Sequence, residues 1–96
     1  MKITAIATKN NAPADFRSCN SFTIFEVDEN GKRHNEKTEK VRSCAYIVDK
    51  VFHLIDAKVE ILYVDEIFEE DTIVLENAEI EVRTGVDETL RGSRPS

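Results

Sequence analysis

The sequence predicts one small α/β domain, in which a strand-rich N-terminal half leads into alternating helices and strands. Three observations support this fold class. Residues 21–28 are rich in the β-branched and aromatic side chains that favour strands. Residues 44–57 carry apolar side chains at helical spacing. Residues 59–64 are almost continuously apolar, as expected of a parallel strand that is covered on both faces.

The N-terminal half predicts three strands. The first covers about residues 2–8, where Ile and Ala alternate with Thr, and a loop at residues 10–14 follows it. The second covers about residues 21–28. An Asn-Gly pair at residues 30–31 then predicts a hairpin turn of type I′, because this pair readily takes positive φ angles. The third strand, about residues 32–40, is polar throughout, so we expect it at an edge of the sheet.

A helix is predicted over about residues 44–57, with Ser43 as its N-cap. The residues expected on its buried face are Cys44, Ile47, Val48, Val51, Leu54 and Ile55. Those expected to lie away from that face are Asp49, Lys50, His53 and Asp56.

A second helix is predicted over about residues 68–77, and its expected apolar stripe consists of Ile67, Val74, Leu75 and Ala78. A short last strand is expected at residues 80–83, followed by a partial helical turn at residues 86–90. The predicted order is therefore β-β-β-α-β-α-β. This order gives a mixed sheet of about five strands with two to three helices packed on it.

The length of the chain favours a single domain. Its 96 residues have room for one core, which we place in residues 1–91, with residues 92–96 as a disordered tail. No run approaches the roughly 20 apolar residues of a membrane span, and residues 1–8 resemble a strand more than a signal peptide. We therefore expect a cytoplasmic protein whose two cysteines are reduced thiols.

Charge is distributed unevenly along the chain. The net charge is −6, but residues 1–48 hold eight Lys and Arg against six Asp and Glu, whereas residues 49–96 hold five against thirteen. Binding to a phosphate backbone needs a footprint of Lys and Arg. This acidic chain is therefore not expected to bind nucleic acid.

The stretch from residue 15 to residue 27 resembles a segment of a known family. The residues that match are Phe16 and the run Ser21-Phe22-Thr23-Ile24-Phe25-Glu26-Val27. They are similar to a loop and strand of the dinitrogenase iron–molybdenum cofactor biosynthesis family, small carrier domains that hold iron–sulfur cluster precursors of the nitrogenase cofactor. Asp15 stands where the family has His, and Arg17 where it has Gly. The resemblance implies a ribonuclease-H-like fold and a non-enzymatic carrier that binds an iron–sulfur cluster or a metal.

The family's second functional loop is of the type Gly-Gly-Ile-Gly, and the matching residues here are Asp65-Glu66-Ile67-Phe68. Glycines let backbone N–H groups approach an anionic ligand. This chain instead places five carboxylates within residues 65–71, which should repel an anionic cluster precursor. The carboxylates suit either a divalent cation, although their spacing does not match an EF-hand, or a solvated helix start that stabilises the helix dipole.

Two cysteines are the candidate metal ligands. Cys19, with Asp15 and Asn20 beside it, lies in the loop where the family's ligand tip would be, and a thiolate there suits a soft metal or cluster. Cys44 opens the first helix, so Cys19 and Cys44 can share one ligand if loop tip and helix start meet at the same end of the sheet. The cofactor-binding candidates are thus Asp15, Cys19 and Cys44. The alternative is that both thiols are small buried side chains.

Two other functions remain open. One is a regulatory or protein-interaction module without a cofactor, whose acidic half meets a basic partner. A thiol sealed in the core favours this alternative, whereas a carrier needs accessible thiols and a partner protein that donates or accepts the cofactor. An enzyme ranks third, because no nucleophile arrangement is present and His34 and His53 are interpreted as surface histidines without metal-spaced partners.

Overall fold

Six strands and two helices make up the described part of the chain, which is residues 2–10, 12–41 and 46–84 of a computed structural model. The strands are β1 (Lys2–Lys9), β2 (Ala12–Pro13), β3 (Ser21–Val27), β4 (Arg33–Lys40), β5 (Ile61–Val64) and β6 (Glu81–Thr84). The helices are α1 (Ile47–Asp56) and α2 (Glu69–Asn77).

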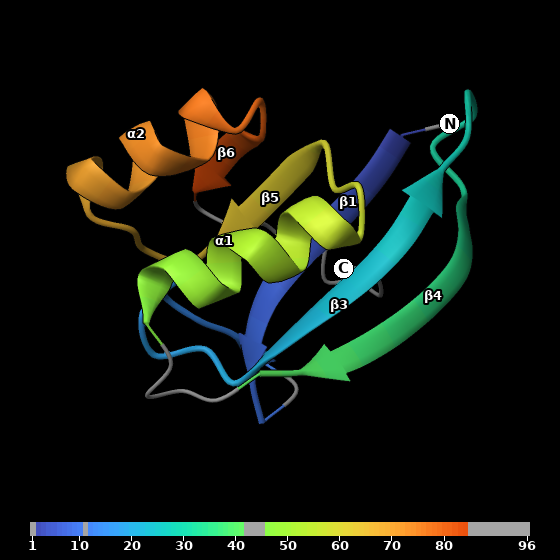
Figure 1. Ribbon diagram of the computed structural model, residues 1–96. Coiled ribbons are helices and arrows are strands. Elements are labelled where there is room, and N and C mark those ends of the chain that lie inside the picture. The colour runs from blue at the N-terminus through green and yellow to red at the C-terminus, as the bar shows by residue number, and fades with distance from the viewer. Residues whose placement is uncertain (1, 11, 42–45, 85–96) are drawn as a thin grey trace.

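The strands form one mixed sheet in the order β4-β3-β1-β5-β6, with β2 added to β1. β1 runs antiparallel to β3 and parallel to β5, and β5 runs parallel to β6. Both helices lie on the same face of this sheet (Figure 1). The predicted α/β class and mixed sheet are therefore confirmed, and the polar strand β4 lies at an edge as expected.

The sheet has one strand more than the predicted order contains. Ala12 and Pro13, predicted as loop, pair with Lys9 and Thr8 of β1. Asn10 makes this possible because it adopts a φ of 55°, a left-handed conformation that Asn tolerates better than most residues. The extra strand is thus a consequence of a tight turn that the composition of the loop does not reveal.

The β3–β4 hairpin differs from the predicted type I′ turn. Gly31 has a φ of 81°, whereas Asn30 is not among the residues with positive φ. The Gly31 N–H donates to the Asp28 carbonyl at 2.9 Å. The Asp28 carboxylate also accepts the backbone N–H groups of Asn30 and Lys32, each at 2.9 Å. This side-chain cap favours a turn in which only the glycine is left-handed.

Helix α1 begins later than predicted and buries a different face. Its N-cap is Tyr46, which makes no side-chain cap hydrogen bond, and the predicted Ser43 cap lies outside the described residues. The buried residues are Lys50, Val51 and Leu54, whereas Val48 and Ile55 are exposed. The predictions for Lys50, Val48 and Ile55 were therefore wrong. Lys50 is buried because carbonyl groups of a neighbouring loop accept hydrogen bonds from it, and a helix face centred on Lys50, Val51 and Leu54 leaves Val48 and Ile55 outside it.

Helix α2 matches its predicted range closely, and Leu75 is buried as expected. Val74, predicted in the apolar stripe, is exposed instead, and the charged Asp71 is buried. The partial helical turn predicted at 86–90 and the tail predicted at 92–96 lie outside the described residues.

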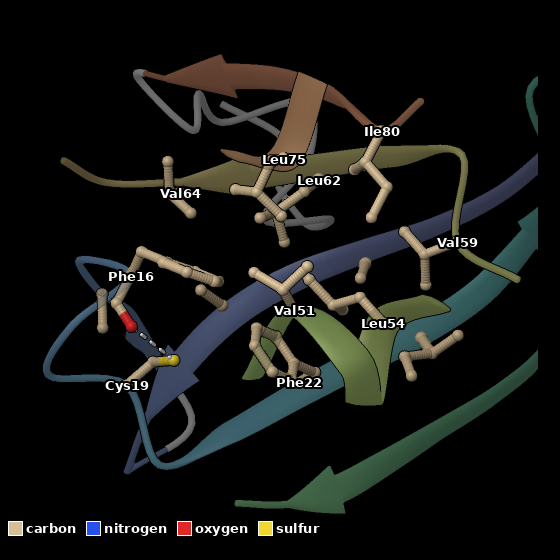
Figure 2. Packing of buried hydrophobic residues seen from close by; sticks show 14 residues of the cluster. Phe16, Cys19, Phe22, Val51, Leu54, Val59, Leu62, Val64, Leu75 and Ile80 are labelled. Carbon is tan, nitrogen blue, oxygen red and sulfur yellow. Dashed lines mark hydrogen bonds between the residues drawn. The ribbon is translucent and has the colours of Figure 1, made fainter. Parts of the chain in front are cut away.

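The core lies between the helices and the sheet face that they cover (Figure 2). Its fully buried members include Phe16 and Phe22, whose ring centroids are 6.2 Å apart, and Leu54 and Leu62 from the helix and the sheet. Phe16 belongs to a loop rather than to a helix or strand, so this loop is part of the core. Among the described residues, no helix is long and apolar enough to cross a membrane.

Candidate functional site

Two loops meet at one edge of the sheet. The first is residues 14–20, before β3, and the second is residues 65–68, between β5 and α2. The Phe16 N–H donates to the Glu66 carbonyl at 3.1 Å, and the Asp65 N–H donates to the Ala14 carbonyl at 3.0 Å. The two loops lie at the carboxyl ends of the parallel strands β1 and β5, where open α/β sheets commonly bind ligands.

Lys50 ties the first loop to helix α1. Its side-chain nitrogen donates to the carbonyl oxygens of Phe16 at 3.0 Å, Arg17 at 2.7 Å and Cys19 at 3.1 Å. These bonds satisfy all three N–H groups of an ammonium that is 1% exposed. The loop therefore turns its carbonyl groups inward, toward a cation supplied by the protein itself.

The sequence does indicate that Lys50 is buried, although its charge suggests an exposed position. Ile47, Lys50, Val51 and Leu54 follow the spacing i, i+3, i+4 and i+7 that defines the inner stripe of a helix. Assigning the inner stripe by this spacing alone, without excluding the charged residue, would have identified Lys50 as a buried group that needs polar partners.

Cys19 is sealed beneath the loop. Its side chain is fully buried, and its thiol donates to the Phe16 carbonyl at 3.1 Å (Figure 2). Burial raises the pKa of the Cys19 thiol, although the nearby Lys50 ammonium opposes this effect. The neutral thiol is therefore favoured, whereas a metal or cluster ligand must be a thiolate. Cys44, the predicted second ligand, lies outside the described residues.

Cys19 should react slowly with thiol reagents. In a Cys44→Ser variant, which leaves Cys19 as the only cysteine of the chain, we expect alkylation of the folded protein at neutral pH to be at least about 100-fold slower than in denaturant, because the thiol is buried and protonated. The measurement is the rate of mass increase with iodoacetamide. Labelling of the folded protein as fast as that of the denatured protein would show that the loop exposes the thiol.

Arg17 joins the first loop to α2. Its Nε donates to one oxygen of Asp71 at 2.9 Å, and its Nη2 donates to the other at 3.2 Å and to Glu70 at 3.1 Å. The guanidinium carbon also lies 4.3 Å from the centre of the Phe68 ring. Two of the five carboxylates in the acidic segment therefore serve as partners of Arg17. The part of the chain that the structure describes contains no group of three His, Cys, Asp or Glu that could hold a metal ion.

The histidines are half-exposed and paired with carboxylates. His34 Nε2 lies 2.7 Å from Asp28, and this hydrogen bond is the main cause of the lowered pKa of Asp28. His53 Nε2 lies 2.6 Å from Glu39, whose pKa is lowered by Lys37 and by His53. Both pairs link neighbouring elements of the fold, and neither contains a residue of the two loops.

A small cleft opens between the two loops. Its volume is about 160 Å³, and it is lined by Asp15, Arg17, Glu66, Ile67 and Phe68. The carboxylates of Asp15 and Glu66 make no ion pair or side-chain hydrogen bond with any residue in 2–10, 12–41 or 46–84. Phe68 is 57% exposed. The cleft therefore combines two available negative charges with an aromatic ring that Arg17 covers on one face, and the two carboxylates suit a cationic group.

The structure places two of the three predicted site residues, whereas Cys44 lies outside the described residues. Asp15 lines the cleft, whereas Cys19 does not line it and is buried in the core. The residues that sequence reasoning missed are Lys50 and Arg17. The loop at Asp65–Phe68, identified only by comparison with a glycine-rich loop, does meet the first loop.

The fold is similar to solved structures, whereas the chain matches no protein-family model and no curated protein sequence. The crystal structure of PH0822 aligns with a TM-score of 0.75 and 16% identity, over 86% of this chain and 78% of that chain. The NMR structure of a NifB-like protein from Thermotoga (TM1290), which belongs to the DUF35 family, aligns with a TM-score of 0.64 and 20% identity, over 85% of this chain and 74% of that chain. At these identities the similarity concerns the fold.

Proposed function

We propose that this chain is a non-enzymatic protein-interaction domain, built on a scaffold of the NifB-like kind, whose cleft binds a basic side chain of a partner protein. The observation that carries the proposal is the pair of carboxylates, Asp15 and Glu66, beside the exposed ring of Phe68. A Lys or Arg side chain can meet both carboxylates, while the Arg17 guanidinium, already paired with Asp71 and Glu70, occupies one face of the ring.

The size of the cleft and the state of Cys19 favour this function over cofactor transport. Ligand pockets for small molecules and cofactors usually measure about 300–1,000 Å³, whereas this cleft measures about 160 Å³. A single side chain suits that volume better than an iron–sulfur cofactor precursor. The buried, protonated thiol of Cys19 also offers no soft ligand to the cleft.

The proposal can be tested by NMR titration with short capped peptides. We expect a Gly-Arg-Gly peptide to shift the amide signals of residues 15–17 and 66–68, and a Gly-Glu-Gly peptide to leave them unchanged. The double variant Asp15→Asn and Glu66→Gln should lose the response by at least about tenfold in affinity, because both charge partners are gone. The matched control is Glu29→Gln with Glu76→Gln, which removes the same charge from exposed positions outside the cleft. Equal responses in both double variants would refute a site in the cleft.

The second candidate is a carrier of an iron–sulfur cluster or of a precursor of the iron–molybdenum cofactor. It is supported by the fold shared with the NifB-like protein and by the resemblance of residues 15–27 to the carrier family. Anaerobic reconstitution with iron and sulfide separates the two functions. A carrier retains stoichiometric iron and loses it in Cys19→Ser and Cys44→Ser, whereas an interaction domain retains none.

A further inference from the structure

The exposed large apolar side chains of the described residues gather on the helices and on the residues just before them. They are Tyr46, Val48, Phe52, Ile55, Phe68, Ile73 and Val74. Single exposed apolar residues need no explanation, but a cluster on one layer of a small domain commonly marks an interaction site. Phe68 belongs to the cleft, and the remaining residues lie on or next to α1 and α2.

Three of these residues form a stripe on α1. Val48, Phe52 and Ile55 follow the spacing i, i+4 and i+7, so they share one flank of the helix. The opposite flank carries His53, which reaches Glu39 of β4. Since β4 and β6 lie at opposite edges of the sheet and α2 packs against β6, the stripe lies on the side of α1 that faces α2 (Figure 1).

On α2, Ile73 and Val74 are exposed. We call the five residues Val48, Phe52, Ile55, Ile73 and Val74 the helix-layer surface. These five side chains are not part of the core, because both helices bury other residues against the sheet, among them Val51, Leu54 and Leu75. The helix-layer surface is therefore an apolar area in addition to the one that folding uses.

The exposed charged residues of the two helices are all acidic, although the exposed Lys58 follows α1 and Arg17 pairs with Glu70. The exposed charged residues of the two helices are Asp49, Asp56, Glu69, Glu70 and Glu76. The only Lys or Arg in either helix is Lys50, which is buried beneath the first loop. An apolar centre with a predominantly acidic rim favours a basic partner.

We propose that the helix-layer surface binds an amphipathic helix of a partner protein, whose apolar face is flanked by Lys and Arg. Helices of this kind lay their apolar face on a hydrophobic surface and pair their flanking charges with the rim. A second copy of this chain is disfavoured, because a symmetric dimer through this surface would place the same acidic rims against each other. The surface is separate from the cleft, so the inference holds whether or not the cleft binds a basic side chain.

The test uses synthetic helical peptides of about 18 residues, or five turns. The probe has leucines on one face and lysines on both flanks. One control peptide has glutamates in place of the lysines, and another has the residues of the probe in an order that destroys the apolar face. We expect the probe to bind the full chain, and both controls to bind at least about tenfold more weakly.

Two variants of the protein locate the binding. The double variant Phe52→Ser with Ile73→Ser should weaken the probe's binding by at least about tenfold while the circular dichroism spectrum stays unchanged, because both side chains are exposed. The cleft variant Asp15→Asn with Glu66→Gln should bind the probe with wild-type affinity, which separates this surface from the proposed cleft site.

Three results would overturn the inference. They are wild-type affinity of the Phe52→Ser, Ile73→Ser variant for the probe, equal affinity of the wild type for all three peptides, and a wild-type dimer in sedimentation that this variant dissociates. The first places any binding elsewhere, the second reduces it to non-specific adhesion, and the third assigns the surface to a second copy of the chain.

Discussion

Replacing Lys50 by methionine is expected to destabilise the protein by about 3–5 kcal/mol, a large part of the stability of a domain of this size. Methionine keeps much of the apolar stem but removes the ammonium. The carbonyl oxygens of Phe16, Arg17 and Cys19 then lose their common donor. The Phe16 carbonyl keeps the Cys19 thiol as a donor. A buried polar group that loses its partner costs about 1–3 kcal/mol, so the Arg17 and Cys19 carbonyls account for the expected loss. The measurement is urea unfolding monitored by circular dichroism.

The matched control for this prediction is Lys32→Met. Lys32 is exposed in the β3–β4 hairpin, so its replacement should change the free energy of unfolding by no more than about 0.5 kcal/mol. The Lys50→Met variant should also label at Cys19 faster than the wild type, because the loop that covers the thiol is no longer tied to α1. A Lys50→Met protein as stable as the wild type would show that the carbonyl groups find other donors.

Truncation of Phe16 should have an effect of similar size for a different reason. Phe16 is fully buried and packs against Phe22, so Phe16→Ala removes a large apolar side chain and leaves a cavity. Such substitutions cost about 3–5 kcal/mol. Because Phe16 also bonds Glu66 through its backbone, the variant should loosen the contact between the two loops and weaken binding of the Gly-Arg-Gly peptide in the cleft.

Phe52→Ala provides the same chemical change at an exposed position. The Phe52 ring is 57% exposed, so its truncation should cost less than about 1 kcal/mol in the same unfolding experiment. A cost for Phe52→Ala equal to that for Phe16→Ala would mean that Phe52 is a core residue. That result would also remove the basis for the helix-layer surface.

The elements that could be predicted are those whose pattern is local. The strand Ser21–Val27 and the apolar strand Ile61–Val64 are rich in residues that suit a sheet, and both were placed within a few residues. Helix α2 was predicted because acidic residues mark its first turn. The strand at Ala12–Pro13 could not be predicted, because two residues carry no periodicity and their pairing depends on the backbone turn at Asn10.

The structure brings together the two loops that the sequence singled out, whereas the predicted ligands in them stay a prediction. The loop around Asp15 meets the loop at residues 65–68, and both were singled out by the family resemblance. The prediction that Cys19 is a ligand stays untested by any bound group, but its burial and raised pKa point to the alternative that the sequence left open. A thiol in a polar loop can be exposed or covered, and only the path of the loop decides between them.

The sequence by itself determined the α/β class, the order of the long elements and the acidic character of the C-terminal half, because these follow from local spacing and composition. Only the tertiary structure decided which charges are available to a partner. It buried Lys50 under three carbonyl groups, paired Arg17 with Asp71, and left Asp15 and Glu66 facing the cleft. The physical reason is that the availability of a charged side chain depends on the groups around it in space. For Lys50 and Arg17 these groups come from segments more than 30 residues away in the chain.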